Sequence, residues 1–354
     1  MPELGRRGGQ LMTIAIAAVG VAIFSLLSLP LPFLLGPLFA CLAAALMGVR
    51  MQDMGRVGTG MRTILGVAVG AAITPDLLTR LPGMAFSVAL VVPYIAVIGL
   101  VGYPFFRRVC GFDGPTSFYA AMPGGFQDMV IFGEEAGADM RALSLIHATR
   151  VLLIVTLVPF LILHFFDQTL DAPPGKPLFD VPVRELALMA VAGIVGWKVG
   201  ERVGLFGASI LGPMILATAF SLGDLLHNRP PAVAILAAQF FIGTSIGAKY
   251  MGVTLRELRI DVLAGLVFCV LIGLCALAFA EISASMGWAP PLEALLAFAP
   301  GGQAEMAVLT IVAGADLAFV VTHHVLRIVV VIIGAPIVGH MFRWKKADAD
   351  RSSR

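Results

Sequence analysis

Charged residues are scarce in this sequence. They make up 13% of its 354 residues, whereas soluble domains contain about 25%. The mean hydropathy is +0.95, and long apolar runs fill most of the chain. This composition excludes a soluble globular protein and indicates an integral membrane protein. Because the net charge is only +2 and no basic cluster accompanies stacking aromatics, we expect no nucleic-acid partner.

Patterns that hold metals or cofactors are also missing. The six histidines form neither a His-x-x-x-His nor a His-Glu-x-x-His pattern. The four cysteines share no ligand-like spacing. We therefore expect no metal site, no cofactor and no enzymatic activity. The cysteines are Cys41, Cys110, Cys269 and Cys275.

The chain instead contains an internal duplication. Met122-Pro123-Gly124-Gly125 recurs as Ala299-Pro300-Gly301-Gly302, 177 residues later. Duplicated apolar halves with broken helices are typical of secondary transporters. The same offset relates Asp128 to Glu305, His147 to His324, Arg150 to Arg327, Asp139 to Asp316, Gly66 to Gly243 and Gly70 to Gly247.

Each copy contains six apolar elements, most of them close to the ~20 residues that a helix needs to cross a bilayer. In the first copy they span 11–29, 33–49, 57–74, 84–106, 115–133 and 143–166. In the second they span 187–203, 207–223, 232–249, 261–286, 292–312 and 317–341. The predicted organisation is membrane repeat 1 at 11–166, a polar proline-rich linker at 167–186, membrane repeat 2 at 187–343 and a polar tail at 344–354. Gly36-Pro37 and Gly212-Pro213 are expected to begin the second element of each copy.

The topology depends on whether the Pro-Gly-Gly elements cross the membrane. If all twelve elements cross, the Lys and Arg residues outside the spans divide into 14 inside and 7 outside. If the Pro-Gly-Gly elements are re-entrant, each copy crosses five times, the second copy is inverted, and the division is 17 to 4. Positive charge favours the cytoplasmic side. We therefore predict an all-α fold of two inverted repeats with ten crossings, in the inner membrane of a bacterium.

The Pro-Gly-Gly elements are the first candidate site. Proline removes a backbone donor, and glycine lowers the cost of leaving helical geometry. Non-helical backbone persists at membrane depth only when it is buried in protein or lines a wet cavity. One interpretation is a binding site for a solute or ion, and the other is a packing kink without a ligand. The residues concerned are Pro123, Gly124, Gly125, Pro300, Gly301 and Gly302.

An acid follows each break, Asp128 in the first copy and Glu305 in the second. A carboxylate in a bilayer is costly unless it is paired, hydrated or neutral. We interpret both as sites for a coupling ion or proton. The alternatives are a fixed ion pair or an N-terminal cap of the following half-helix.

An arginine lies inside the sixth element of each copy, one turn after a histidine. The pairs are His147 with Arg150 and His324 with Arg327. Spacing of three residues places each pair on one helical face. The pairs are candidates for binding an anionic group of the substrate. The alternative is a salt bridge to Asp128 or Glu305 that pins the Pro-Gly-Gly element.

Two further motifs have structural interpretations. Asp139 and Asp316 follow Gly-Ala and precede an apolar run, which predicts N-caps. Glycines four residues apart occur at Gly66 and Gly70 and again at Gly243 and Gly247. This spacing indicates close helix packing. The alternative is a polar cavity wall that involves Arg62 or Gln239.

The duplicated Pro-Gly-Gly-x-x-acid-Met, Gly-Ala-Asp and His-x-x-Arg motifs resemble the AbrB-type membrane protein family, over essentially 11–343. The resemblance implies a duplicated polytopic protein, and members have labels that include ammonia monooxygenase and regulator of gene expression. Monooxygenase chemistry needs a redox metal held by convergent ligands. Each intramembrane histidine of these motifs is instead followed by an arginine, which would repel a cation.

Three functions follow from these residues. The first is a secondary transporter of a small polar or anionic solute, coupled to H⁺ or Na⁺, with a central site between the repeats. The second is a membrane sensor that affects gene expression indirectly, and the third is a membrane enzyme. The expected partners are the solute, the coupling ion, the lipid bilayer and, as an open alternative, a second copy of the chain.

Reporter fusions in the predicted linker test the topology. Five crossings in the first copy place the segment from Asp167 to Arg184 outside the cytoplasm. An alkaline phosphatase fusion there should be active, whereas a green fluorescent protein fusion should stay dark. The reverse result would contradict the inverted arrangement.

Overall fold

The computed structural model describes residues 6–341, except Asp53, Asp167, Thr169, Asp171 and Phe206. Helices dominate the described residues, and no strand occurs among them. This confirms the predicted all-α class. The polar tail predicted at 344–354 lies outside the described residues, as do three positions of the predicted linker.

Most helices follow the predicted elements, but the element predicted at 84–106 begins earlier, at Pro75, and comprises two helices. In the first copy they are α1 Arg6–Leu26, α2 Pro32–Leu46, α3 Gly55–Ala72, α4 Pro75–Ala89, α5 Val91–Pro104, α6 Gly114–Ala121, α7 Phe126–Glu135 and α8 Met140–Phe165. In the second they are α9 Val183–Arg202, α10 Ala208–Leu222, α11 Ala232–Ala248, α12 Leu255–Glu257, α13 Leu263–Ser285, α14 Pro291–Phe298, α15 Gln303–Val312 and α16 Leu317–Met341. π-Helical turns extend α5 through Phe105–Val109 and join α12 to α13 through Leu258–Val262.

Five described helical segments are long and apolar enough to cross a membrane. Several shorter apolar helices accompany them, among them α2, α10, α11 and α15. This is the character of a multi-pass membrane protein. The five segments are Gly8–Leu26, Pro82–Val109, Met140–Phe165, Leu255–Ser285 and Leu317–Gly339.

The chain forms two compact units, each of which draws on both halves of the sequence. The first unit comprises Met1–Pro82, Val155–Val253 and Ala304–Ala318. The second comprises Gly83–Ile154, Thr254–Gln303 and Phe319–Arg354. The second unit therefore contains both Pro-Gly-Gly segments, His147, Arg150, His324 and Arg327.

In the first unit, the glycine pairs allow helices of opposite copies to touch. A methyl group added at Gly66 or Gly70 of α3 would overlap with the carbonyl oxygens of Ile210 or Met214 on α10. In the same way, Gly243 and Gly247 of α11 lie against main-chain atoms of α2. The predicted close packing is confirmed, and it occurs twice with the roles of the copies exchanged.

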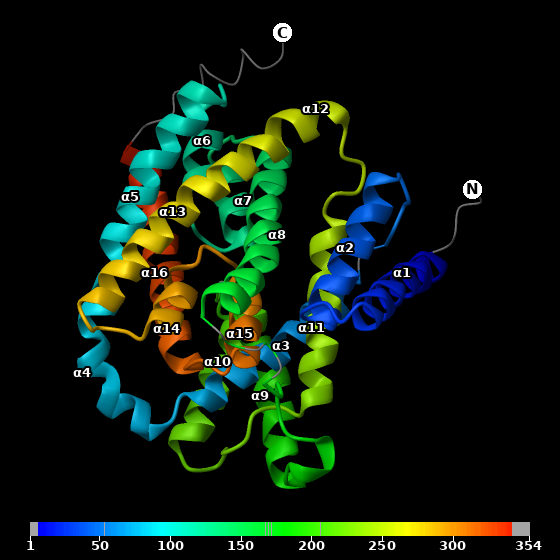
Figure 1. Ribbon diagram of the computed structural model, residues 1–354, viewed down its shortest axis with the longest axis vertical. Coiled ribbons are helices and arrows are strands. Elements are labelled where there is room, and N and C mark those ends of the chain that lie inside the picture. The colour runs from blue at the N-terminus through cyan, green and yellow to red at the C-terminus, as the bar shows by residue number, and fades with distance from the viewer. Residues whose placement is uncertain are drawn as a thin grey trace. The chain divides into compact units, whose positions relative to one another are not determined.

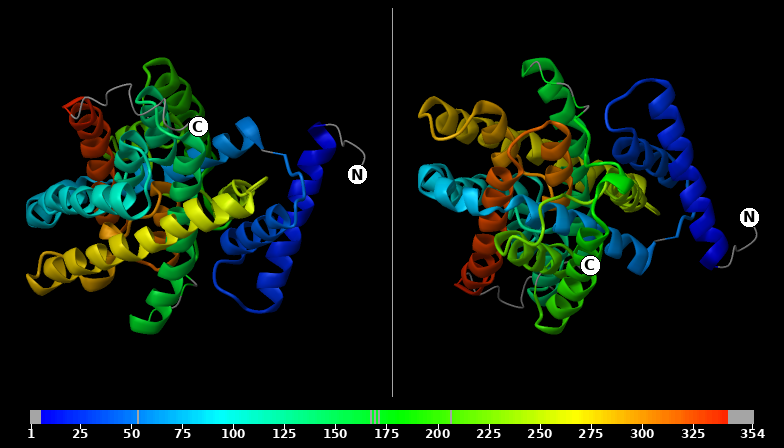
Figure 2. Two further views of the ribbon diagram at one scale, coloured as in Figure 1. Left: turned by 90° about the horizontal axis from the view of Figure 1, so that it is seen from above. Right: turned by 90° about the horizontal axis from the view of Figure 1, so that it is seen from below.

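The Gly-Pro pairs lie inside helices, so the prediction that they begin α2 and α10 was wrong. α2 begins at Pro32 and α10 at Ala208, which leaves Pro37 and Pro213 in helix interiors. The preceding glycines have a packing role, because Gly36 meets Gly20 of α1 backbone to backbone and Gly212 meets Gly196 of α9. α1 and α2 lie side by side in both views of Figure 2.

These contacts also refine the repeat register. Gly20 corresponds to Gly196 and Gly36 to Gly212, an offset of 176 rather than 177. The loop from α10 to α11 covers nine residues, 223–231, whereas that from α2 to α3 covers eight, 47–54. The additional residue therefore lies in the loop from α10 to α11, and the constant offset of 177 holds only from α3 onward.

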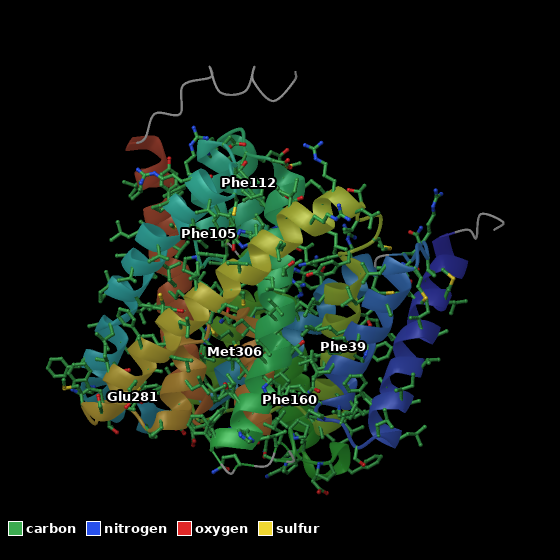
Figure 3. All side chains as sticks on the ribbon, turned by 45° about the horizontal axis from the view of Figure 1, so that its top comes forward. Phe39, Phe105, Phe112, Phe160, Glu281 and Met306 are labelled. Atoms are coloured by element: carbon green, nitrogen blue, oxygen red, sulfur yellow. The ribbon has the colours of Figure 1, made fainter. Side chains whose placement is uncertain are left out.

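In the second unit, α5 lies beside α13 (Figure 1), and aromatic side chains, Phe105 among them, pack at this contact (Figure 3). The ring of Phe268 lies 4.7 Å from that of Phe106 and 6.0 Å from that of Phe105, centroid to centroid. Gly102 of α5 gives Phe268 room, because a methyl group there would lie 2.7 Å from that ring. The close fit anchors α5 beside α13, and α6 continues from this anchor into the first Pro-Gly-Gly segment.

We predict that Gly243→Ala destabilises the protein, because the methyl group meets the rigid backbone of α2 at Leu34. Overpacking of this kind costs about 1–3 kcal/mol. Gly273→Ala is the matched control, since nothing lies within 4 Å of an added methyl group in that helix. The control should be neutral or stabilising by up to ~1 kcal/mol. Thermal unfolding in detergent measures both, and equal midpoints would contradict the packing role.

Candidate functional site

Both Pro-Gly-Gly segments interrupt a helix. α6 ends at Ala121 and α7 begins at Phe126, while α14 ends at Phe298 and α15 begins at Gln303. Between them the backbone is extended, with φ −70° and ψ 128° at Met122 and φ −54° and ψ 130° at Ala299. The predicted helix breaks are therefore confirmed.

Each of the glycines in the first break is required by a close neighbour. A methyl group at Gly124 would lie 2.7 Å from the side chain of Met129 and 2.9 Å from Val331 on α16. One at Gly125 would overlap with the carboxylate of Asp128. Larger residues would push these groups out of place.

Arg150 holds the first break by donating hydrogen bonds to the main-chain carbonyls of the break. The Nη1 atom donates to Met122 O at 3.2 Å, and Nη2 donates to Gly124 O at 3.0 Å. The arginine is 2% exposed. Charge-assisted hydrogen bonds are the strong ones in a protein interior. They supply donors to carbonyls that the helix break has left without helical partners.

Arg327 holds the second break in the same way. Nη1 donates to Ala299 O at 2.9 Å, and Nη2 donates to Gly301 O at 2.7 Å. The carbonyls are those that correspond to Met122 and Gly124 at an offset of 177. We call these two arrangements the arginine clamps.

The histidines fasten the preceding half-helices. His147 Nε2 bonds to Tyr119 O at 3.1 Å, and His324 Nε2 bonds to Leu296 O at 2.9 Å. A carbonyl oxygen can only accept, so Nε2 carries the proton in both rings. In the second copy, His324 Nδ1 and Arg327 Nε are buried and have no hydrogen-bond partner among the described residues.

The acids lie in the first turns of α7 and α15, and the four hydrogen bonds of the clamps go to main-chain carbonyls and not to these carboxylates. Asp128 is half-buried beside Gly125, and Glu305 is 8% exposed. Within the described residues, the Glu305 carboxylate has no hydrogen bond or ion pair. A negative charge is stabilised in the first turn of a helix. The arginines were predicted either to bind an anionic group or to pin the Pro-Gly-Gly element by a salt bridge to Asp128 or Glu305. The geometry supports pinning, but the predicted partners were wrong, because the arginines bond main-chain carbonyls.

The first Pro-Gly-Gly element folds back on itself. Asp113 caps α6 by accepting from Thr116 N at 2.7 Å. Twenty-three residues later, Asp139 N donates to Thr116 Oγ1 at 2.8 Å. The end of the element thus returns to its beginning. This hairpin geometry supports the re-entrant alternative for the first copy.

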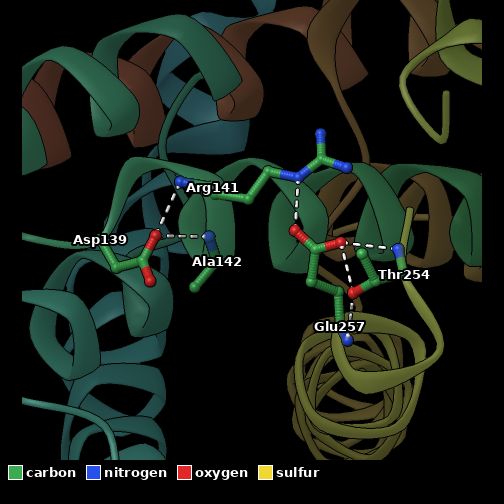
Figure 4. Close-up of polar contacts among 5 residues, drawn as sticks. All are labelled: Asp139, Arg141, Ala142, Thr254 and Glu257. Carbon is green, nitrogen blue, oxygen red and sulfur yellow. Dashed lines mark hydrogen bonds and ion pairs between the residues drawn. The ribbon is translucent and has the colours of Figure 1, made fainter. Parts of the chain in front are cut away.

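The end of the hairpin is linked to α12 (Figure 4). Asp139 Oδ1 accepts from the main-chain N of Arg141 and of Ala142, which confirms the predicted N-cap of α8. Arg141 Nε donates to Glu257 Oε1 at 2.8 Å, and Glu257 forms a capping box with Thr254. The second predicted cap is also confirmed, because Asp316 Oδ1 accepts from Ala318 N.

The sequence analysis missed Tyr94, which lies between the copies. Its hydroxyl donates to Phe298 O at 2.7 Å, at the end of α14. Tyr94 is 1% exposed. It has no repeat counterpart, since position 271 is leucine. A single tyrosine in an apolar run indicates a hydrogen bond inside the protein, but the periodicity of the sequence does not show which carbonyl accepts it.

Comparison with known proteins identifies relatives along most of the chain. A family model described as "Transition state regulatory protein AbrB" matches residues 33–343. "Uncharacterized protein YhjN" of Bacillus subtilis (strain 168) is 29% identical over 352 residues, which cover 92% of this chain and 91% of that protein. "Putative regulator AbrB" of Escherichia coli (strain K12) is 24% identical over 326 residues, with 89% and 91% covered.

We predict that Arg327→Gln loosens the second break, because two charge-assisted bonds to carbonyls are lost. Each such bond contributes about 1.5–3 kcal/mol, so amide hydrogen exchange at 301–304 should accelerate at least about tenfold. Arg107→Gln is the control, since this exposed guanidinium also donates to a carbonyl, Phe112 O at 2.9 Å. Water can replace the bond to Phe112 O, so amide exchange around Phe112 should change little in Arg107→Gln. Unchanged exchange at 301–304 would contradict the clamp.

Proposed function

This chain belongs to the AbrB family, and from that premise we propose that it is a secondary transporter of a small anionic or polar solute. The observation that carries the proposal is the pair of arginine clamps. They hold two broken-helix loops in one compact unit, with equivalent carbonyls in both copies. A duplicated protein with two fixed helix breaks has the parts that transporters use for a central site.

The loops would bind the solute through their backbone. α7 and α15 begin directly after the breaks, so their first N–H groups and the positive ends of their dipoles face the loops. Such helix starts bind anions. In this role the arginines are positioning residues that hold the loops, and the Nε of Arg327 adds a donor without a protein partner among the described residues.

Asp128 and Glu305 would bind the coupling ion or proton. Each follows a break within one helical turn, and Glu305 has no protein partner in the described part of the chain. A carboxylate that is buried without a partner is stabilised by protonation or by a cation. Loading and release of that ion would then favour different states of the loops, as coupling requires.

We further propose ten crossings in two inverted repeats, in the inner membrane of a bacterium. The hairpin closed by Asp139 and Thr116 supports a first Pro-Gly-Gly element that enters and leaves by one face. The charge division of 17 to 4 supports the same arrangement for both copies. Alternating access would follow from the motion of helix groups around the loops.

The second candidate is a membrane sensor that binds the same solute and signals to a partner. Its support is the name of the Escherichia coli relative, which describes a regulator. Transport of a metabolite can also change gene expression indirectly. A sensor would bind a solute without moving it, so flux in reconstituted liposomes separates the two candidates.

The test is uptake by purified protein in liposomes. The probes are labelled phosphate, sulfate, succinate and citrate, each with an inward proton or sodium gradient. The wild type should accumulate at least one of them. Asp128→Asn and Glu305→Gln should lower gradient-driven uptake at least about tenfold, a loss of ~1.4 kcal/mol or more, because each removes the titratable ligand.

Glu281→Gln is the matched control. This acid lies on α13 and is exposed (Figure 3), so its uptake should equal that of the wild type. Folded protein is verified by gel filtration in every case. Full gradient-driven uptake by both acid variants would refute the coupling role, and a folded wild type that moves no probe under either gradient would refute transport.

A further inference from the structure

A hydrogen-bonded chain of three side chains is buried in the second unit, apart from the clamps. It joins Ser87 of α4, Ser283 of α13 and His323 of α16, each 0% exposed. Ser87 Oγ lies 2.9 Å from Ser283 Oγ and 2.9 Å from His323 Nε2. His323 Nδ1 lies 2.9 Å from Phe319 O. The chain therefore ends on an imidazole one residue before His324.

The carbonyl of Phe319 sets the direction of these bonds. A carbonyl only accepts, so Nδ1 of His323 carries a proton. In the neutral ring, Nε2 is then a lone pair that accepts from Ser87. Because Ser87 has one hydroxyl hydrogen, Ser283 must donate to Ser87. If Nε2 gains a proton, it donates to Ser87, and both hydroxyls can turn around. The neutral ring therefore satisfies every member of the chain, whereas the charged ring leaves the Ser283 hydroxyl hydrogen without an acceptor among the described residues.

The fold does not need polar residues at this place. In the repeat, Ser87, Ser283 and His323 correspond to Ala264, Phe106 and Ile146. All three counterparts are buried and apolar, at 6%, 0% and 1% exposure. Apolar packing therefore fills the equivalent position in the other copy. Buried polar groups cost free energy unless they are fully paired, which favours a functional reason for the serine–serine–histidine chain.

The histidine is next to the second Pro-Gly-Gly segment. Its ring packs edge-on against Phe298, with centroids 5.7 Å apart, and Phe298 directly precedes Ala299. Glu281 on α13 is exposed. Arg327 is a fixed positive charge on α16, the helix that also contains His323. The other titratable or charged groups among the described side chains of the surrounding helices are His324 on α16, Tyr94 and Tyr103 on α5, Cys269 and Cys275 on α13, and Glu293 on α14.

We propose that His323 is a further proton-binding group, beside Asp128 and Glu305, that couples anion movement to the proton gradient, with Ser87 as its hydrogen-bond partner. The proposal rests on the proposed transport function and identifies its coupling ion and the class of solute. A second positive charge near Arg327 is unfavourable alone. An anion at the loop compensates for it, so proton and anion load together and leave together.

The experiment compares two modes of transport in the liposomes described above, with the probe that the wild type moves best. Exchange of the solute across the membrane, at equal pH on both sides, requires only the solute site. Net uptake under an inward proton gradient also requires the coupling group. His323→Gln should retain exchange and lose gradient-driven uptake at least about tenfold.

Ser87→Ala provides a second readout if His323→Gln does not fold. A bond from a charged imidazole to a hydroxyl is stronger than one from a hydroxyl to a neutral imidazole. Loss of Ser87 therefore disfavours the charged ring and should move half-maximal net uptake to lower pH. Ser285→Ala and His164→Gln are the controls, because both side chains are exposed, and both should match the wild type.

The outcomes separate the two proposals. Exchange without a proton response in His323→Gln supports the coupling role. A full proton response in that variant, or an unchanged pH profile in Ser87→Ala, overturns the coupling role while transport stands. A wild type that exchanges no probe overturns transport, and the coupling role with it.

Discussion

The structure depends on how backbone carbonyls are satisfied where a helix is interrupted inside an apolar protein. Water is scarce there, and an unpaired carbonyl costs free energy. Arg150 and Arg327 solve the problem in the same way, each donating to the carbonyls of the first and third residues of its segment. Each guanidinium in turn has part of its buried charge compensated by carbonyl dipoles. Loop and arginine therefore require one another, which explains why both recur at one spacing in the two copies.

Duplication reproduced this framework but not its surroundings. Glycines of α3 touch α10 as glycines of α11 touch α2, so the packing is equivalent in the two copies. Tyr94, Ser87, Ser283 and His323 have apolar counterparts. The contacts that occur in both copies are those on which the packing of each copy depends. Polar residues that occur in only one copy of an apolar interior are instead candidates for a functional role, which is the reason for assigning a proton to His323.

The family relationship and the geometry contribute different information. Two relatives of nearly the same length have names that state no transported solute. The geometry contributes two fixed loops with helix starts behind them and an acid in the first turn of each helix. The chemistry of these groups favours an anionic solute, because helix starts and arginine donors attract negative charge.

The sequence alone determined the helical class, most helix bounds within a few residues, the two breaks and the caps at Asp139 and Asp316, because these depend on local properties of the chain. It did not determine what each buried polar group bonds. The arginines could have paired with Asp128 and Glu305, but they bond carbonyls. Pro37 could have begun a helix, but it lies within α2. Tyr94, Ser87 and His323 had no local pattern to mark them. Only the tertiary structure decides such contacts, since they join groups far apart in the chain, and neither periodicity nor spacing encodes which of them meet.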